Sequence, residues 1–273
     1  MIYLTGANGF IGTKLLHYAN SFNINIKVLH YCPVSNLWDG LNEIQKDDIV
    51  IHAGAHSSRS ALEHVLLSKN VYATYLLARA IRTSKANLIF LSAGSVTPQK
   101  ELELISFQTH PNPSDPYSWS KYACESIISE FIDSKNRIII RLPAIYSNNL
   151  QGYGILHNWL LQSKERGVIK IESIHSKLNC FYTAELLVKF IFNLLNNFAG
   201  RKNLFYVGCY QHASIYDIAK YFCSYSKSNI ETVKICSAGN YLFDIADGLS
   251  LGLTSISVFD VIDYFFKDSS FNV

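Results

Sequence analysis

Hydrophobic residues along the chain follow two alternating patterns. Short continuous apolar runs, which are typical of strands covered on both faces of a sheet, occur at residues 2–4, 26–29, 49–52, 88–91 and 137–142. Longer segments with apolar residues at helical spacing lie at residues 10–21, 71–84 and 120–131. Strands that alternate with helices imply βαβ units with right-handed crossovers. The pattern therefore predicts an α/β protein with a doubly wound parallel sheet.

Two departures from a regular alternation predict how the chain is organised. About twenty residues separate the second apolar run from the third, which is too few for a helix, a strand and their connections. We therefore expect one βα unit to be shortened or absent. Beyond residue 147 the pattern changes to helices with short strands, such as 168–171 and 204–207. This change predicts a first domain over residues 1–147 and a smaller lobe over 148–273, packed on the first.

Composition narrows the class of protein. Of the 273 residues, 49% are hydrophobic and 16% are charged, which indicates a globular chain. The net charge is only +3 and the basic residues are scattered, so no nucleic acid partner is expected. The most apolar helical segment, residues 185–195, is too short to span a bilayer, and no signal-peptide pattern opens the chain. We expect a cytoplasmic protein without a membrane partner.

The cysteines support the same location. No CxxC pair occurs, and no cysteine stands near a histidine at zinc spacing. They are interpreted as buried thiols in a reducing compartment. The six positions are 32, 124, 180, 209, 223 and 236.

The stretch MIYLTGANGFIG places three glycines between an apolar run and a helical pattern. Gly6, Gly9 and Gly12 are three residues apart, where the backbone must turn tightly and approach another group closely. A helix N-terminus carries unpaired N–H groups that attract an anion such as a pyrophosphate. The spacing therefore predicts a dinucleotide-binding turn. Its other members expected to contact the cofactor are Asn8, Phe10 and Ile11.

A second motif, PYSWSK, places a tyrosine and a lysine at the start of a helix. Tyr117 and Lys121 are four residues apart, so they share one helix face. A nearby ammonium group stabilises a phenolate and lowers its pKa, as a general acid or base near neutral pH requires. Alone, this spacing also fits a solvated helix face. Its position after a dinucleotide turn and between two predicted parallel strands favours the catalytic interpretation.

These two motifs, with DDIVIHAGA and the RLPAIYS strand end, resemble the extended short-chain dehydrogenase/reductase family, also called the NAD-dependent epimerase/dehydratase family. The resemblance covers residues 1–146 well and continues weakly through CFYTAELL at residues 180–187. It implies a Rossmann-like domain that binds NAD or NADP and a C-terminal α/β lobe that holds a nucleotide-linked sugar. The shortened βα unit makes the chain more similar in outline to sugar-nucleotide reductases, such as dTDP-4-dehydrorhamnose reductase, than to the longer epimerases.

The resemblance also implies roles for individual residues. Tyr117 would exchange a proton with a sugar oxygen, and Lys121 would hold the nicotinamide ribose. The third catalytic position follows the fourth parallel strand, in IFLSAGSVT. An ungapped alignment places Ala93 there, with Ser92 just before it, whereas a one-residue bulge at the following glycine places Ser95 there. We predict Ser95, which would hydrogen-bond the reacting oxygen.

Several positions bear on the cofactor. The second strand ends in KVLHYCP, so His30 replaces the acid that would bind a ribose 2′-hydroxyl. Without that carboxylate nothing repels a 2′-phosphate, which slightly favours NADP or use of both coenzymes. Further residues expected at the cofactor are Ala53, Gly54, Ala55 and Ser92.

Other departures from the family pattern limit the reaction. Neither Ala93 nor Ser95 is followed by the Asp-Glu pair of the family's dehydratases, so dehydration is disfavoured. The family's arginine for the nucleotide diphosphate is replaced near Leu178 and Asn179. His175 or Lys177 could substitute, but the sequence favours interpreting both as ordinary surface residues.

The remaining polar and aromatic candidates have simple structural interpretations. His52 and His56 follow a strand end and are interpreted as satisfied polar groups, and no metal site is expected. Asn70 is interpreted as the N-cap of the helix that starts at residue 71. Three residues where the lobe begins could contact a ligand or fill a core: Tyr153, His157 and Trp159.

Together these observations predict an NAD(P)-dependent reductase of a nucleotide-activated deoxysugar, reducing a 4-keto group in surface-polysaccharide biosynthesis. A nucleotide-sugar epimerase with tightly bound NAD is the enzymatic alternative. A catalytically silent NAD(P)-binding sensor or scaffold is the alternative outside enzymes. A homodimer through the helices near Val71 and Ser120 remains open.

Overall fold

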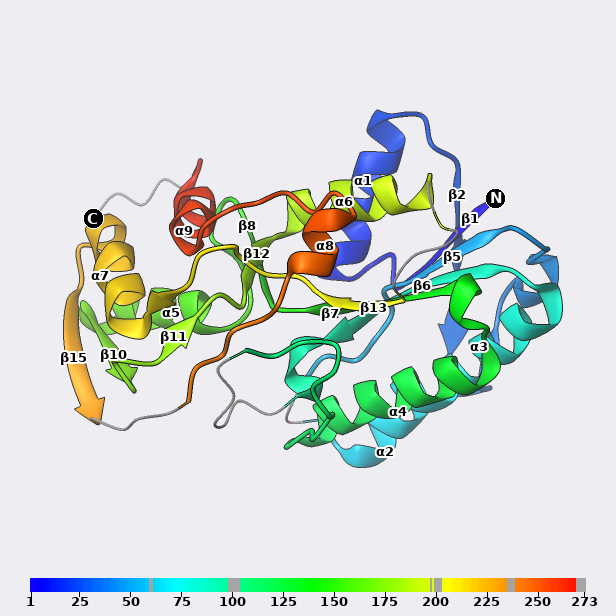
Figure 1. The fold of residues 1–273 in the computed structure, drawn as a ribbon, viewed down its shortest axis with the longest axis horizontal. Coiled ribbons are helices and arrows are strands. Elements are labelled where there is room, and N and C mark those ends of the chain that lie inside the picture. The colour runs from blue at the N-terminus through cyan, green and yellow to red at the C-terminus, as the bar shows by residue number, and fades with distance from the viewer. Residues whose placement is uncertain (59–60, 98–103, 197, 199–202, 235–238, 269–273) are drawn as a thin grey trace. The chain divides into compact units, whose positions relative to one another are not determined.

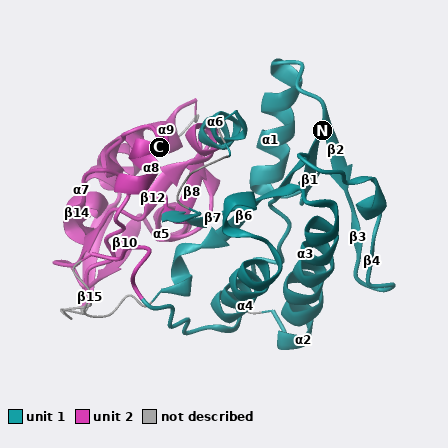
Figure 2. Ribbon diagram, turned by 45° about the vertical axis from the view of Figure 1, so that its right-hand side comes forward, with its two compact units in different colours: residues 1–98, 110–141, 188–205 teal, residues 99–109, 142–187, 206–273 magenta. Residues whose placement is uncertain are grey.

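The computed structural model describes residues 1–58, 61–97, 104–196, 198, 203–234 and 239–268 (Figure 1). Its chain divides into two compact units, coloured in Figure 2. Unit 1 contains residues 1–98, 110–141 and 188–205, and unit 2 contains residues 99–109, 142–187 and 206–273. Both units thus combine segments that are distant in sequence. The single boundary after residue 147 stays a prediction.

Unit 1 is built on a six-stranded sheet in the order β13-β7-β6-β5-β1-β2. The strands are β1 (Ile2–Thr5), β2 (Ile26–Leu29), β5 (Ile49–His52), β6 (Asn87–Ala93), β7 (Arg137–Leu142) and β13 (Leu204–Tyr206). The pairs β1–β2, β1–β5 and β5–β6 are parallel. The predicted doubly wound parallel sheet is therefore confirmed.

Helices cover both faces of this sheet (Figure 1). α3 (Ala73–Ser84) and α4 (Pro116–Phe131) pack together on one face. α1 (Phe10–Ser21) lies on the other face with the part of α6 (Ala184–Leu195) that belongs to unit 1. The rings of Tyr18 and Phe192 lie 4.7 Å apart there. Because both faces are covered, strand residues such as Val50 and Phe90 are wholly buried, and their sequence shows no polar alternation.

A hairpin occupies the short segment between β2 and β5. β3 (Tyr31–Cys32) pairs antiparallel with β4 (Leu37–Trp38), and a single 3-10 turn, Leu41–Glu43, follows. The Trp38 indole N–H donates to the Ala73 carbonyl at 2.9 Å, which fixes the hairpin against the start of α3. The sheet ends at β2, so the prediction of a missing βα unit is confirmed.

The helix before β6 starts earlier than the sequence predicted. α2 (Glu63–Leu66) continues through a π-helical turn, Leu67–Tyr72, into α3. Asn70 lies inside that turn and is 2% exposed. The prediction that Asn70 caps a helix N-terminus is therefore wrong, because the helix already runs through it.

Unit 2 mixes short strands with helices. Its sheets pair β12-β8-β9, β10-β15 and β11-β14. The strands are β8 (Ala144–Ser147), β9 (Gln151–Gly152), β10 (Val168–Glu172), β11 (Lys177–Leu178), β12 (Phe181–Thr183), β14 (Ala213–Ser214) and β15 (Asn229–Lys234). The helices are α5 (Ile155–Arg166), the start of α6, α7 (Ile215–Ser226), α8 (Ala246–Ser250) and α9 (Val258–Phe266). Trp159, Phe222 and Phe265 belong to the buried core that joins them.

The described residues include five of the six cysteines, and these differ in exposure. Cys124 and Cys209 are buried thiols as expected, and Cys180 and Cys223 are only partly buried. Cys32 is exposed, so the expectation is wrong for that residue. Cys236 lies outside the described residues. In the part of the chain that the structure describes, no helix has both the length and the apolar character that crossing a membrane would need.

Candidate active site

The β1–α1 turn is closed by its own glycines. Gly6 has a φ of +71°, and its carbonyl accepts the Gly9 N–H at 2.9 Å. A Cβ added at Gly6 would lie 2.5 Å from the Gly54 Cα, and one added at Gly12 would lie 2.0 Å from the Gly6 carbonyl oxygen. Both glycines are therefore required by close contacts within the protein.

Gly9 has a different environment. It is the N-cap of α1, with φ −81° and ψ 169°, a conformation that other residues also adopt. A Cβ added at Gly9 would lie 3.2 Å from the Gly6 carbonyl oxygen, a tight contact that requires a shift of a few tenths of an ångström. Gly9 and Asn8 are exposed, and the following Phe10 and Ile11 are half-buried. A bare, exposed N-cap leaves the first N–H groups of α1 accessible to a phosphate.

The strand ends beside this turn are joined by hydrogen bonds. The Gly54 N–H, between Ala53 and Ala55 after β5, donates to the Thr5 hydroxyl oxygen at 3.0 Å. Thr5 Oγ1 also lies 2.6 Å from His52 Nδ1, and His52 Nε2 lies 2.9 Å from Thr74 Oγ1. The predicted cofactor-binding residues 53–55 are therefore fixed directly against β1.

His52 is held neutral by its surroundings. It is 2% exposed, and burial lowers its pKa to about 3, with the Lys121 ammonium lowering it further. Both ring nitrogens have hydroxyl partners. The interpretation of His52 as a satisfied polar group is confirmed.

The predicted catalytic pair lies one turn apart at the start of α4. Asp115 caps this helix by accepting the Ser118 N–H at 2.9 Å, and Pro116 occupies its first position. Tyr117 is half-buried, whereas Lys121 is 2% exposed. The sequence motif therefore places one partly accessible phenol and one buried ammonium on the same helix face.

Lys121 is anchored to the sheet rather than solvated. Its Nζ donates to the Leu91 carbonyl at 2.6 Å and lies 4.1 Å from the centroid of the Phe90 ring. Burial lowers the pKa of Lys121 to about 8, and the Glu125 carboxylate opposes this decrease. The group is thus predominantly charged at neutral pH but close to its titration range.

The two serines considered for the third catalytic position point into different surroundings. The Ser92 hydroxyl donates to Glu125 Oε1 at 2.5 Å in a buried network. Ser95 lies after the end of β6 in the 3-10 turn Gly94–Val96, and its Oγ is 2.7 Å from Ser118 Oγ. The Ser118 hydroxyl donates its proton to Asp115 Oδ2 at 2.8 Å. Only the Ser95 hydroxyl is therefore tied to the first turn of α4, where Tyr117 stands.

Asn70 joins the cofactor strand ends to α4, a connection that the sequence analysis missed. Its amide oxygen accepts the His56 N–H at 2.7 Å, and its amide nitrogen donates to the His56 carbonyl at 3.1 Å and to Ser120 Oγ at 3.0 Å. Ser120 in turn donates to the Tyr117 carbonyl at 2.7 Å. The π-helical turn places this amide inward, and such turns are frequent at functional sites.

The structure also places the predicted cofactor-specificity position. His30 is exposed directly after β2, and its carbonyl accepts the Asp39 N–H at 2.9 Å from the far side of the hairpin. No carboxylate follows β2 until Asp39.

In unit 2, Asn179 lies near where the resemblance expects the family's arginine, and its side chain is an internal amide. Asn179 is 6% exposed; its nitrogen donates to the Cys209 and Phe243 carbonyls at 3.0 and 2.9 Å, and its oxygen accepts the Phe243 N–H at 2.7 Å. This amide links three segments of unit 2, those around residues 179, 209 and 243. The nearby His175 and Lys177 are exposed.

The three candidates at the start of the lobe differ in exposure. Trp159 is 2% exposed and packs against Phe222, so it is a core residue. Tyr153 is 70% exposed. His157 is half-buried, and its Nδ1 is buried without a hydrogen-bond partner among the described residues. Of the three, His157 has the polar atom that a ligand could satisfy.

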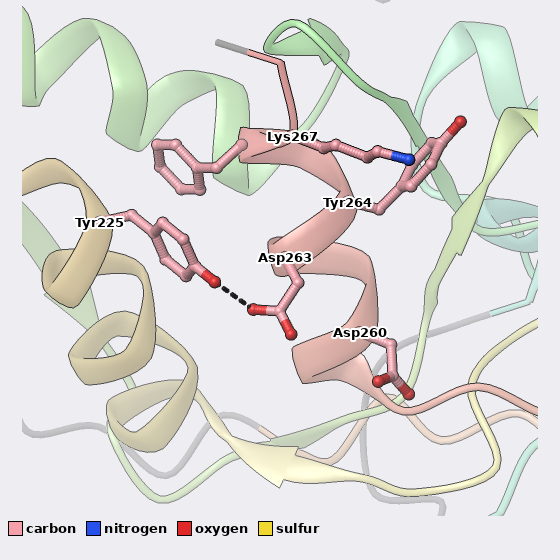
Figure 3. A pocket seen from close by; sticks show the side chains of 6 residues that line it. Tyr225, Asp260, Asp263, Tyr264 and Lys267 are labelled. Carbon is pink, nitrogen blue, oxygen red and sulfur yellow. Dashed lines mark hydrogen bonds between the residues drawn. The ribbon is translucent and has the colours of Figure 1, made fainter. Parts of the chain in front are cut away.

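Two cavities are present among the described residues, and the first includes Asp115 and Ser120 in its lining. One of about 390 Å3 in unit 1 is lined by residues of α2, the π-helical turn and α4, including Leu67 and Trp119, which are 58% and 55% exposed. The other, of about 320 Å3 in unit 2, lies between α7 and α9 (Figure 3). There Tyr225 donates to Asp263 Oδ1 at 2.6 Å. Among the described residues no cluster of three or more His, Cys, Asp and Glu could hold a metal ion.

Comparison with protein families identifies the chain. The family model described as the RmlD substrate binding domain matches residues 1–242. The chain belongs to this family. A search of curated proteins finds no significant match.

Solved structures share the fold of this RmlD-type chain. The dTDP-4-dehydrorhamnose reductase from Yersinia enterocolitica has a TM-score of 0.78 at 18% identity, covering 97% of this chain and 99% of that one. The reductase from Bacillus anthracis, in complex with NADP, has a TM-score of 0.74 at 21% identity, covering 97% of both chains. The UDP-glucuronic acid 4-epimerase from Bacillus cereus, in complex with NAD, has a TM-score of 0.75 at 19% identity, covering 97% and 96%.

These comparisons bear on the sequence predictions. The resemblance to the extended short-chain dehydrogenase/reductase family is confirmed by the RmlD family match and by the shared fold. The prediction of NAD or NADP agrees with the coenzymes in the Bacillus structures. Both a reductase and an epimerase share the fold of this RmlD-family chain, so the fold does not separate the two reactions.

Proposed function

We propose that the protein is an NAD(P)-dependent oxidoreductase that reduces the 4-keto group of a nucleotide-activated sugar. The observation that carries the proposal is the buried Lys121, one helical turn after Tyr117 and bonded to the Leu91 carbonyl near the end of β6. A buried ammonium beside an accessible phenol is an arrangement suited to proton transfer. Family membership supports the same class of reaction.

The residues of unit 1 fit a dinucleotide. The N-terminus of α1, capped by the exposed Gly9, would hold the pyrophosphate. The segment Ala53–Gly54–Ala55, fixed through Thr5, would line the path of the coenzyme. Lys121 would hold the nicotinamide ribose with the N–H groups that do not bind Leu91. When bound, the coenzyme supplies the hydride.

The reaction then needs one hydride and one proton. As hydride reaches C4 of the sugar, the C4–O double bond becomes a single bond and its electron pair moves to the oxygen. Tyr117 donates its phenolic proton to that oxygen, and the Lys121 ammonium stabilises the charge left on the phenol. Ser95 would hydrogen-bond the same oxygen. Neither Ala93 nor Ser95 is followed by acidic residues, which disfavours elimination of water.

Coenzyme preference and partners extend the proposal. The exposed His30 after β2 brings no carboxylate to a 2′-phosphate, which favours NADP. The exposed apolar residues Leu67 and Trp119 at the α2–α4 cavity mark the face for a homodimer, which sedimentation of the intact protein tests. A cytoplasmic location and a role in surface-polysaccharide biosynthesis stay predictions.

Tyr117→Phe tests the reaction. With dTDP- and UDP-linked 4-keto sugars as substrates, we expect the wild type to oxidise NADPH stoichiometrically, followed by its absorbance. Tyr117→Phe should lose at least about a hundredfold in kcat with coenzyme affinity retained, because it lacks the proton. Tyr122→Phe, on the same helix, is the matched control and should keep wild-type turnover.

Two results would contradict the reductase. Conversion of a sugar to its C4 epimer without net NADPH consumption, by protein that purifies with bound NAD, would identify the epimerase. Coenzyme binding without turnover of any sugar nucleotide would favour the sensor or scaffold. Wild-type turnover by Tyr117→Phe would remove the mechanism altogether.

A further inference from the structure

Glu125 extends the line of the proposed catalytic residues along α4. It follows Lys121 by four residues and Tyr117 by eight, so the three share one helix face. Glu125 is 4% exposed. Carboxylates are seldom buried to this degree unless they are paired, so its partners are informative.

The Glu125 carboxylate has two fixed partners. Arg141 on β7, itself 2% exposed, donates from Nη2 to Oε2 at 2.7 Å and from Nε to Oε1 at 3.0 Å. Ser92 on β6 adds its hydroxyl to Oε1 at 2.5 Å. This two-pronged pair with a third donor holds the carboxylate in one orientation.

Two successive residues of β6 are thereby bound by α4. The Leu91 carbonyl accepts from Lys121, and the Ser92 hydroxyl donates to Glu125. The side chains of adjacent strand residues point to opposite faces of a sheet. Here α4 contacts both residues because it binds the backbone carbonyl of Leu91 and the side chain of Ser92. The helix that carries Tyr117 is thus bonded to the last residues of β6, shortly before Ser95.

Stability alone does not explain a buried ion pair. Removing two charges from water costs about as much as their attraction returns, and a hydrophobic replacement of both is often neutral or stabilising. In some proteins such a pair is retained because it fixes the arrangement of other groups.

Glu125 also determines the electrostatics around Lys121. Of the groups facing this ammonium, His52 on β5 is neutral because burial lowers its pKa to about 3, and Phe90 on β6 presents its ring. Burial raises the pKa of Cys124 on α4, so that residue stays an uncharged thiol at neutral pH. Arg141 on β7 is paired with Glu125. Glu125 is therefore the carboxylate that offsets the burial of Lys121.

We propose that Glu125 is a positioning residue for the Tyr117–Lys121 pair: clamped by Arg141 and Ser92, its carboxylate fixes α4 on β6 and keeps Lys121 charged. The importance of Glu125 for catalysis rests on the proposed function. Its effect on the position of α4 and on the charge of Lys121 does not. The pKa of Lys121 is about 8, so a small further decrease would neutralise the group at physiological pH.

Titration of Lys121 by NMR tests the proposal without coenzyme or substrate. In protein labelled with 13C at the lysine Cε, the Lys121 signal is assigned by its absence in Lys121→Met. We expect Glu125→Gln to lower the pKa of Lys121 by about half a unit or more, because the offsetting charge is lost. Glu130→Gln, which removes an exposed carboxylate from the same helix, should leave it unchanged.

Glu125→Gln leaves Arg141 buried without its carboxylate partner, which could unfold the protein. A second variant controls for this effect. Glu125→Met with Arg141→Met removes both charges. Because Glu125 raises the pKa of Lys121 and Arg141 is not among the groups that shift it, the Lys121 pKa should again fall. If Lys121 titrates in this double variant and in Glu125→Gln as it does in Glu130→Gln, the proposal is overturned, whatever the melting temperatures. Because no coenzyme enters the experiment, that result would leave the proposed reaction untouched.

Discussion

Gly6, Gly9 and Gly12 share one turn but have different neighbours. Gly6 and Gly12 face backbone atoms of the protein at distances that no Cβ tolerates. Gly9 has an ordinary conformation, an exposed position and a single tight contact. At the scale of one residue, the absence of a side chain therefore serves the fold at two positions and the proposed ligand at the third.

Substitution by alanine should separate the two roles. Gly12→Ala should destabilise the protein by about 1–3 kcal/mol in urea unfolding, because its methyl group meets the Gly6 carbonyl. Gly9→Ala should leave stability unchanged within about 1 kcal/mol yet weaken NADPH binding about tenfold or more in calorimetric titration. Equal coenzyme affinity in Gly9→Ala and wild type would show that no phosphate approaches Gly9.

The π-helical turn Leu67–Tyr72 is the element that connects the two halves of the site. It turns the side chain of Asn70 inward, where the amide binds His56 after β5 and Ser120 on α4. A regular helix would place residue 70 differently relative to α3. The element thus couples the strand ends that would line the coenzyme to the helix that carries Tyr117.

Asn70→Ala should therefore be costly. It leaves the His56 N–H, the His56 carbonyl and the Ser120 hydroxyl without the amide, and we expect a loss of at least about 2 kcal/mol in the free energy of unfolding. Asn20→Ala, at an exposed position of α1, should change it by no more than about 0.5 kcal/mol. Similar unfolding midpoints for the two variants would contradict the structural role of Asn70.

The same elements show how far the sequence could be interpreted. The strands 26–29, 49–52 and 137–142 were predicted with the bounds that the structure has, because buried β-branched runs are distinctive. The helix predicted over 120–131 ends where α4 does, but α4 begins four residues earlier, at Pro116. Asp115 and the proline after it are an N-terminal signal that the prediction did not use. The π-helical turn was not predicted, since an asparagine before an apolar helical pattern also fits an N-cap. Hydrogen bonds among Ser92, Glu125 and residues distant in sequence depend on tertiary packing, which periodicity does not encode.

At the scale of the whole molecule, the two units are interleaved along the chain. Unit 1 includes residues 188–205, which lie along the chain between the stretches 142–187 and 206–273 of unit 2. These residues include much of α6 and two residues of the edge strand β13, which belongs to the six-stranded sheet. The chain must therefore be complete to about residue 205 before the sheet has all its strands.

A truncation tests this arrangement. The fragment 1–147 lacks the α6 residues that lie with α1 on one face of the sheet, so apolar surface of that face would be exposed to water. We expect no cooperative urea unfolding and no NADPH binding by this fragment, with the intact protein as control. Cooperative unfolding and intact-like affinity would instead support a single domain boundary near residue 147.

The burial of Lys121 has a consequence for covalent labelling. Amine acylation requires an accessible, neutral amine, and this Nζ is enclosed and committed to the Leu91 carbonyl. Exposed lysines such as Lys177 meet no such obstacle. Mass spectrometry after brief acetylation would thus report, from one position, the fraction of molecules in which the helix of Tyr117 has come away from its strand.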